Sequence, residues 1–160
     1  PEVLIAASCS KNLGLYRERA GLAIFVCQDS ANAEAILSQA KASARRVYSM
    51  PPAHGALLAG RVLGDTQLSA IWREELETMC ARINGLRSDL RVALEKASGR
   101  DFAFIEREKG MFSFLGLAPE QAQRLREEFS VYMLDSSRIN VAGVNAGNID
   151  YLAQSVAKVL

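Results

Sequence analysis

The sequence predicts a chain of mixed class, with an α/β part at its amino end, an α+β part at its carboxyl end and one long helix between them. Two continuous apolar runs near the amino end predict two strands of a larger sheet. A sustained spacing of three to four residues between apolar positions predicts the long helix. At 160 residues, with 49% hydrophobic and 23% charged residues, the chain should bury a core in one domain, with room for a second small lobe.

The two apolar runs cover residues 3–7 and 20–27. Each is short, continuous and bounded by polar residues, which is typical of a strand buried on both faces of a parallel sheet. Residues 8–19 form a polar loop between them. Loops between sheet strands often hold ligands, because the scaffold fixes them while water and substrate can reach them.

Two helices are predicted next, over residues 31–48 and 53–63. Asp29 or Ser30 could cap the first helix, and the two prolines that follow it push the chain out of the helical region. Gly64-Asp65 should break the second helix and cap the next one.

Residues 66–97 carry the long apolar periodicity, from Leu68 to Leu94, with charged residues between the apolar ones. This predicts one amphipathic helix, roughly 45 Å long at 1.5 Å per residue. Such a helix is too long for a compact single domain of this size, so we expect it to connect two lobes. Gly99 is a suitable residue to end it.

Beyond Gly99 the pattern is that of an α+β lobe. Pro119 stands where a helix should begin, and Lys109-Gly110 is a plausible turn between the first two strands. The expected strands cover residues 102–107, 112–117, 131–134 and 139–142, and the expected helices cover residues 119–129 and 146–159.

Composition excludes several classes of partner. The net charge of +1 gives no strong field for nucleic acid or an anionic membrane, and no apolar stretch approaches the ~18 residues that span a bilayer. We therefore expect no nucleic-acid and no membrane partner, and a soluble cytoplasmic protein. Three widely spaced cysteines and one histidine predict neither a disulfide framework nor a metal site.

Lys11 is the first candidate for chemistry, because it follows a strand among small polar residues. A lysine in such a place can act as an amine nucleophile, although most loop lysines are solvated surface residues. Ser8, Ser10 and Arg19 add two hydroxyls and a guanidinium, which together suit a phosphate group. A phosphate beside an amine nucleophile suggests pyridoxal phosphate.

Arg138 is the second candidate, because arginine binds a carboxylate through two parallel hydrogen bonds. Its neighbours predict a strand end, where such a side chain could bind the carboxylate of an amino acid. Alternatively, Arg138 could form a surface ion pair with an acid such as Asp135.

The segment that contains Lys11 resembles a motif of class I (fold type I) aminotransferases, in the aspartate and aromatic amino acid branch. Further stretches resemble the same branch in the same order, so that the resemblance extends over the whole chain. The matching stretches are SCSKNLGLYRERAG at 8–21, Tyr48-Ser49, PPAHG at 51–55, WREEL at 72–76, GMFSF at 110–114, RLREEF at 124–129 and RINVAG at 138–143.

The resemblance implies a role for each candidate. Lys11 matches the lysine that binds pyridoxal phosphate covalently and later shuttles the substrate's proton, while Ser8, Ser10 and Arg19 match the residues that bind the phosphate. Arg138 matches the arginine that binds the substrate α-carboxylate. Arg45 matches an arginine that reaches the neighbouring subunit's site and binds the distal carboxylate of a dicarboxylic substrate.

The resemblance also implies an activity and an organisation. We expect transamination of aromatic and/or dicarboxylic amino acids with 2-oxoglutarate, which uses amino acid and 2-oxo acid substrates in a homodimer. Residues 1–65 would be a remnant of the large domain that binds the cofactor, residues 66–97 an interdomain helix, and residues 98–160 the small carboxyl-terminal domain. Aspartate preference and aromatic preference stay open.

The chain departs from the family pattern at Leu13, Met50 and Ser137 and in its length. Ser137 stands where many members carry glycine, and we expect it to be tolerated if its backbone φ is negative. The chain also begins at Pro1, so we expect a carboxyl-terminal portion of a longer protein, which on its own would expose apolar strand faces. The isolated chain could instead be a non-catalytic fragment that acts only by folding and association.

Overall fold

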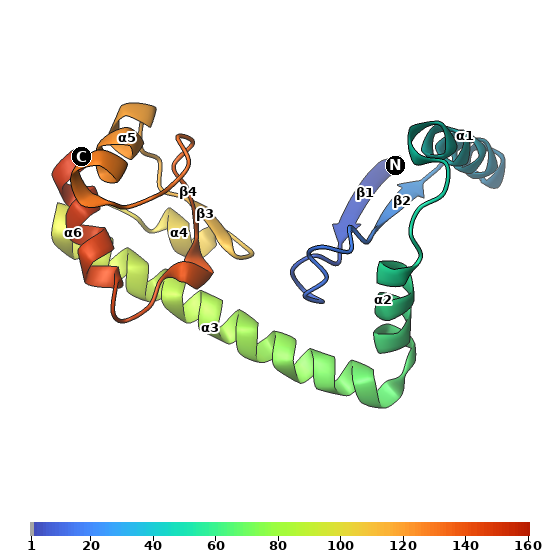
Figure 1. Cartoon of the computed structure of the whole chain (residues 1–160), viewed down its shortest axis with the longest axis horizontal. Coiled ribbons are helices and arrows are strands. Elements are labelled where there is room, and N and C mark those ends of the chain that lie inside the picture. The colour runs from blue at the N-terminus through green and yellow to red at the C-terminus, as the bar shows by residue number, and fades with distance from the viewer. Residues whose placement is uncertain (1) are drawn as a thin grey trace. The chain divides into compact units, whose positions relative to one another are not determined.

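The computed structural model describes residues 2–160, and the chain divides into two compact units, residues 1–76 and 77–160 (Figure 1). The first unit contains two strands, two helices and the start of a third helix. The second unit contains the rest of that helix, a two-stranded sheet and three further α-helices. No helix among residues 2–160 is long and apolar enough to cross a membrane.

Strands β1 (Val3–Ser8) and β2 (Gly21–Val26) lie side by side in the first unit (Figure 1). They pair antiparallel, with Val3 opposite Val26 and Ser8 opposite Gly21. The expectation of a parallel sheet is therefore wrong. Parallel neighbours need a crossover of a dozen or more residues, usually a helix, whereas the link here is a non-helical loop that turns the chain straight back.

The expectation that these strands are buried on both faces is also wrong for this chain, because all residues of both strands are exposed. Leu4 is 67% exposed and Leu22 is 60% exposed, although each sequence run has the composition of a sheet interior. This result confirms the expectation that the two strands alone would present uncovered apolar faces.

The helices of the first unit follow their capping residues. Helix α1 (Ser30–Tyr48) begins after Asp29, whose side chain accepts a hydrogen bond of 2.8 Å from the backbone N–H of Asn32. Asp65 follows the end of helix α2 (His54–Gly64) as its C-cap, and α3 (Thr66–Ser98) begins at the next residue. The Asp65 carboxylate accepts hydrogen bonds from the first turn of α3, as the sequence predicted.

Helix α3 is one continuous helix of 33 residues that crosses the boundary between the two units. Its predicted end is confirmed, because Gly99 adopts a φ of 69° and its N–H donates to the carbonyl of Glu95. The elements that follow are α4 (Phe104–Arg107), β3 (Phe112–Phe114), α5 (Pro119–Phe129), β4 (Arg138–Asn140), a 3₁₀ turn η1 (Val141–Gly143) and α6 (Ile149–Val159).

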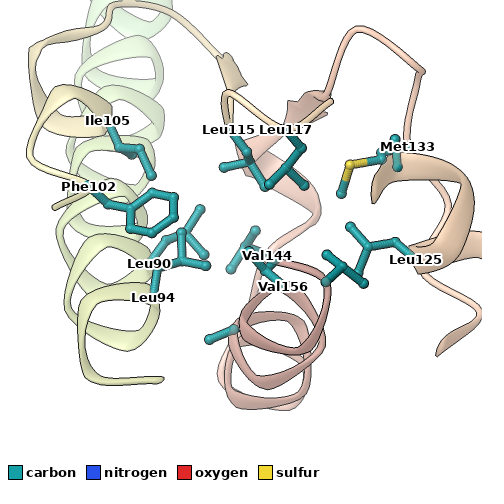
Figure 2. Close-up of a cluster of buried hydrophobic side chains, with 13 residues drawn as sticks. Leu90, Leu94, Phe102, Ile105, Leu115, Leu117, Leu125, Met133, Val144 and Val156 are labelled. Carbon is teal, nitrogen blue, oxygen red and sulfur yellow. The ribbon is translucent and has the colours of Figure 1, made fainter. Parts of the chain in front are cut away.

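The core of the second unit lies between α3, α5, α6 and the chain around β3 and β4 (Figure 2). Leu90 and Leu94 from α3, Leu125 from α5 and Val156 from α6 are completely buried in it. Burial of this apolar surface drives the folding of the unit.

Two strands predicted in this unit are absent from the described residues. Within residues 102–107 the chain forms the short helix α4 in place of a strand: the Asp101 carboxylate accepts from the Ala103 N–H, and Phe102 and Ile105 are both buried in the core at helical spacing. Residues 131–134 form no strand, because the Val131 N–H ends α5 by donating to the carbonyl of Leu125.

The remaining pairing is β3 with β4, antiparallel, with Phe112 opposite Asn140 and Phe114 opposite Arg138. The predicted hairpin at Lys109-Gly110 therefore does not join two paired strands, although Gly110 does turn the chain with a φ of 81°. Strands β3 and β4 are each shorter than the runs that predicted them, and Val141 belongs to the 3₁₀ turn.

Arg87 of α3 connects the helix to the segment that leads into β3. It is 1% exposed, and its guanidinium donates to the carbonyls of Ile105 at 2.8 Å, Gly110 at 2.8 Å and Phe112 at 2.6 Å. Nη1 also lies 3.2 Å from the carboxylate of Glu108. A single buried side chain thus supplies the hydrogen bonds that this irregular segment lacks internally.

Candidate functional site

The loop between β1 and β2 begins with a pair of serines. Ser8 is the last residue of β1, and its Oγ donates to Oγ of Ser10 at 3.0 Å. The backbone N–H of Ser10 donates in turn to Oγ of Ser8 at 3.1 Å. The two hydroxyls therefore lie together at the strand end, where both can turn toward an anion.

Lys11 and Arg19 lie against the same aromatic ring in this loop. Nζ of Lys11 is 3.7 Å from the centroid of the Tyr16 ring, and Cζ of Arg19 is 5.9 Å from it. Nη1 of Arg19 also donates to the Tyr16 carbonyl at 3.0 Å. The loop thus brings the amine and the guanidinium to one side chain, and both are exposed to solvent.

Helix α2 approaches the loop closely. His54 Nδ1 lies 2.9 Å from the carboxylate of Glu18, next to Arg19 in the chain. Gly55 is buried at the same place, since a Cβ there would come within 2.7 Å of Cβ of Glu18. Only glycine permits this approach, which fixes the second half of the loop.

Helix α3 holds the first half of the loop. The indole N–H of Trp72 donates to the carbonyl of Asn12 at 2.7 Å, directly beside Lys11. Sequence reasoning placed Trp72, His54 and Gly55 in family-like stretches but gave them no part in holding the loop. The only signal in the sequence was that these residues lie in stretches that match the family. The contacts themselves join residues far apart in the chain, so the sequence does not show them.

The other two candidates lie outside this loop. Arg45 is in the last turn of α1 and is exposed at a helix end, where a cation suits the helix dipole. Arg138 begins β4 in the second unit, with Cζ 4.8 Å from the Phe112 ring centroid. Asp135, the surface partner considered for it, pairs with Arg126 at 2.7 Å instead.

Arg138 lines a cavity of about 840 Å³ in the second unit. Its walls are mainly apolar and aromatic, and Phe112, Tyr132 and Tyr151 contribute to them together with the polar Asn140. A guanidinium in an apolar setting suits a ligand that combines an anionic group with an apolar body.

The residues of the β1–β2 loop fit the pyridoxal phosphate that the sequence suggested. The fit rests on the donor set, because two adjacent hydroxyls and a guanidinium suit a phosphate, and a primary amine in the same loop suits an aldehyde. The two hydroxyls, the amine and the guanidinium all lie within segments 8–11 and 16–19. Contacts from helices α2 and α3 hold this loop in place.

Comparison with known proteins matches residues 1–156 to the family model described as Aminotransferase class I and II. The chain is 46% identical over 160 residues to an aromatic-amino-acid aminotransferase of Pseudomonas aeruginosa and equally identical to an aspartate aminotransferase of Escherichia coli. In both comparisons the match covers 99% of this chain. The chain spans about 40% of the length of each of these relatives.

Solved structures agree with this result. An aromatic amino acid aminotransferase with 3-indolebutyric acid superposes with a TM-score of 0.90 at 46% identity, over 99% of this chain and 41% of that one. An aromatic-amino-acid aminotransferase from Burkholderia pseudomallei, covalently bound to pyridoxal phosphate, gives 0.86 at 41% identity, over 99% of this chain and 40% of the other. The chain therefore belongs to the class I and II aminotransferase family of enzymes.

Proposed function

We propose that this chain is part of a pyridoxal-phosphate-dependent aminotransferase that acts on aromatic and/or dicarboxylic amino acids with 2-oxoglutarate. The observation that carries the proposal is the gathering of Lys11, Ser8, Ser10 and Arg19 in one loop held by two helices. The names of the relatives, aromatic-amino-acid and aspartate aminotransferase, support both substrate classes. The complete protein would be a cytoplasmic homodimer.

The cofactor, when bound, supplies an electron sink for the bond that breaks at the substrate α carbon. Lys11 would supply the primary amine that holds the aldehyde, and the free amine would be able to take up and return a proton at the substrate α carbon. The hydroxyls of Ser8 and Ser10 and the guanidinium of Arg19 would hold the phosphate.

The two remaining arginines would recognise the substrate. Arg138 binds the α-carboxylate through its planar guanidinium, and Arg45 binds the distal carboxylate of a dicarboxylic substrate in the neighbouring subunit. In this proposal residues 1–65 belong to the cofactor-binding domain, residues 66–97 form the interdomain helix, and residues 98–160 form the small domain.

A second candidate function is that of a non-catalytic fragment that acts only by folding and association. The exposure of Leu4, Leu22 and the other apolar residues of β1 and β2 favours this alternative for the isolated 160 residues. Uncovered faces of this kind bury themselves against another chain segment, and a site at the end of such a sheet works only when the sheet is complete.

Covalent trapping distinguishes the two functions. The chain is incubated with a substoichiometric amount of pyridoxal phosphate and reduced with borohydride, and the labelled lysine is identified by peptide mass mapping. The chain has five lysines, at positions 11, 41, 96, 109 and 158. The proposal predicts that most of the label is on Lys11, because Ser8, Ser10 and Arg19 lie in the same loop as this amine.

Matched variants control the experiment. Lys11→Arg should remove most of the label, whereas Lys41→Arg, at an exposed position of α1, should leave it unchanged. Label spread evenly over the five lysines, or unaffected by Lys11→Arg, would leave the fragment function as the account of the isolated chain.

A further inference from the structure

Ser137 adopts a backbone conformation that side chains rarely take. Its φ is +60°, in the left-handed region, so the negative φ on which its expected tolerance depended is not present. A residue with a Cβ is strained there, whereas glycine is not. A serine that persists in this conformation must be held by its surroundings.

Three hydrogen bonds hold Ser137. Its N–H donates to the carbonyl of Leu134 at 2.8 Å, and its carbonyl accepts from the N–H of Leu115 at 3.1 Å. Its Oγ accepts from the N–H of Gly116 at 3.1 Å. Ser137 is only 1% exposed, so the hydroxyl is enclosed and water does not compete for the Gly116 N–H.

The third of these bonds is the one that glycine could not make. Gly116 also has a left-handed φ, of 73°, and its N–H belongs to the irregular segment that follows β3. The Ser137 hydroxyl thus links the residue before β4 to the segment after β3 by a side-chain hydrogen bond, in addition to the backbone pairing of the two strands.

Arg138 follows directly and depends on this anchor. In the β3–β4 pair, Ser113 and Ile139 share the inner face, while Phe112, Phe114 and Arg138 share the other face. Arg138 and Phe112 are diagonal neighbours on that face, which agrees with the 4.8 Å between the guanidinium carbon and the ring centroid. A rotation of the backbone at residue 137 would turn the Arg138 side chain away from the ring and from the cavity that it lines.

We propose that Ser137 is a positioning residue for Arg138, and that its buried hydroxyl, bonded to Gly116 N–H, sets the direction in which the guanidinium meets a substrate carboxylate. The inference rests on the proposed function only in the last point, that Arg138 binds a carboxylate. Placement of the guanidinium over Phe112 by the Ser137 hydroxyl can be tested without activity.

The test measures the Arg138 side-chain resonances by NMR, because protons above the Phe112 ring are shifted upfield by its ring current. Phe112→Leu gives the value without the ring. In Ser137→Ala and in Ser137→Gly, the Arg138 signals should move more than halfway to that value, and the Gly116 amide should lose its protection from hydrogen exchange. Ser136→Ala, the same change at the exposed neighbour, should alter neither.

The two variants separate the hydroxyl from the strain. Ser137→Gly removes the strained φ, so it should stay folded, and it lacks the hydroxyl just as alanine does. Arg138 signals in Ser137→Gly that equal those of the unchanged chain would overturn the proposal, because the backbone alone would then place the guanidinium. A failure of the proposed function has a different signature: cofactor label spread over all lysines, with the Arg138 shifts still dependent on Ser137.

Discussion

Replacing Arg87 by methionine should destabilise the second unit by about 3–5 kcal/mol, the usual loss when one partner of a buried charged network is removed. The change leaves the carbonyls of Ile105, Gly110 and Phe112 without their donor and Glu108 without its counter-charge. Each buried group left unsatisfied costs about 1–3 kcal/mol.

The total is smaller than a simple sum of these values for two reasons. Gly110 and Phe112 are exposed, so water can reach their carbonyls once the guanidinium is gone. Nε of Arg87 also has no hydrogen-bond partner within residues 2–160, so the native side chain already carries part of its desolvation cost. A loss of about 3–5 kcal/mol is a large share of the stability of a small domain.

The assay is native-state hydrogen exchange at amides of the core, such as those of Leu125 and Val156. The only tryptophan, Trp72, lies in the first unit, so its fluorescence would miss the change. Arg91→Met, one helical turn further along α3, is the control, because Arg91 is more exposed and pairs with Glu95 and Glu106 at the surface. Equal losses for Arg87→Met and Arg91→Met would refute the reasoning.

Two further changes have expected outcomes. Gly55→Ala should destabilise the first unit, because the new Cβ would lie 2.7 Å from Cβ of Glu18. Gly60→Ala, on the open side of α2, should instead stabilise this unit by about 0.5–1 kcal/mol. Urea unfolding followed by tryptophan fluorescence measures both changes, and equal effects of the two substitutions would contradict the close approach at Gly55. The Arg124 side chain lowers the pKa of Glu128, mainly through its hydrogen bond and also through its charge. The pair therefore stabilises the fold at pH values above the ordinary carboxyl pKa. This contribution is lost as the pH falls through the lowered pKa of Glu128. Glu128→Gln should therefore make stability less sensitive to acid, and an unchanged acid limb in unfolding experiments at a series of pH values would show that the pair does not contribute.

Local signals predicted much of the fold. Asp29, Asp65, Gly99 and Pro119 each mark a helix end through hydrogen bonds or backbone angles within a few residues, so a sequence pattern can identify them. The long apolar periodicity of α3 likewise repeats over many turns and leaves little room for another interpretation.

The errors arise where a residue's structure depends on distant partners. The run at 131–134 has strand-forming residues but pairs with no described strand. The run at 102–107 has aromatic residues near its start, but it contains a short helix, and Phe102 and Ile105 both enter the core. Antiparallel pairing of the first two strands could not be deduced from their apolar composition, which is shared by parallel and antiparallel interiors.

The candidate site divides in the same way. Lys11, Ser8, Ser10 and Arg19 could be selected as candidates from the sequence because they occupy one short loop and carry a recognisable motif. The supports of that loop could not, since Trp72 is 60 residues from Asn12 and His54 is 36 residues from Glu18. The left-handed φ of Ser137 was also missed, because most serines have a negative φ.

The central claim is that Ser8, Ser10 and Arg19 bind a phosphate beside the Lys11 amine, and one comparison tests it most directly. The rate of borohydride-trapped modification at Lys11 is measured with pyridoxal phosphate and with pyridoxal, which has the same aldehyde and no phosphate. We predict that the phosphate form reacts about tenfold faster or more at Lys11, as expected for a charge-assisted hydrogen bond, and that Arg19→Leu removes most of the difference. Equal rates for the two aldehydes at Lys11 would contradict the claim.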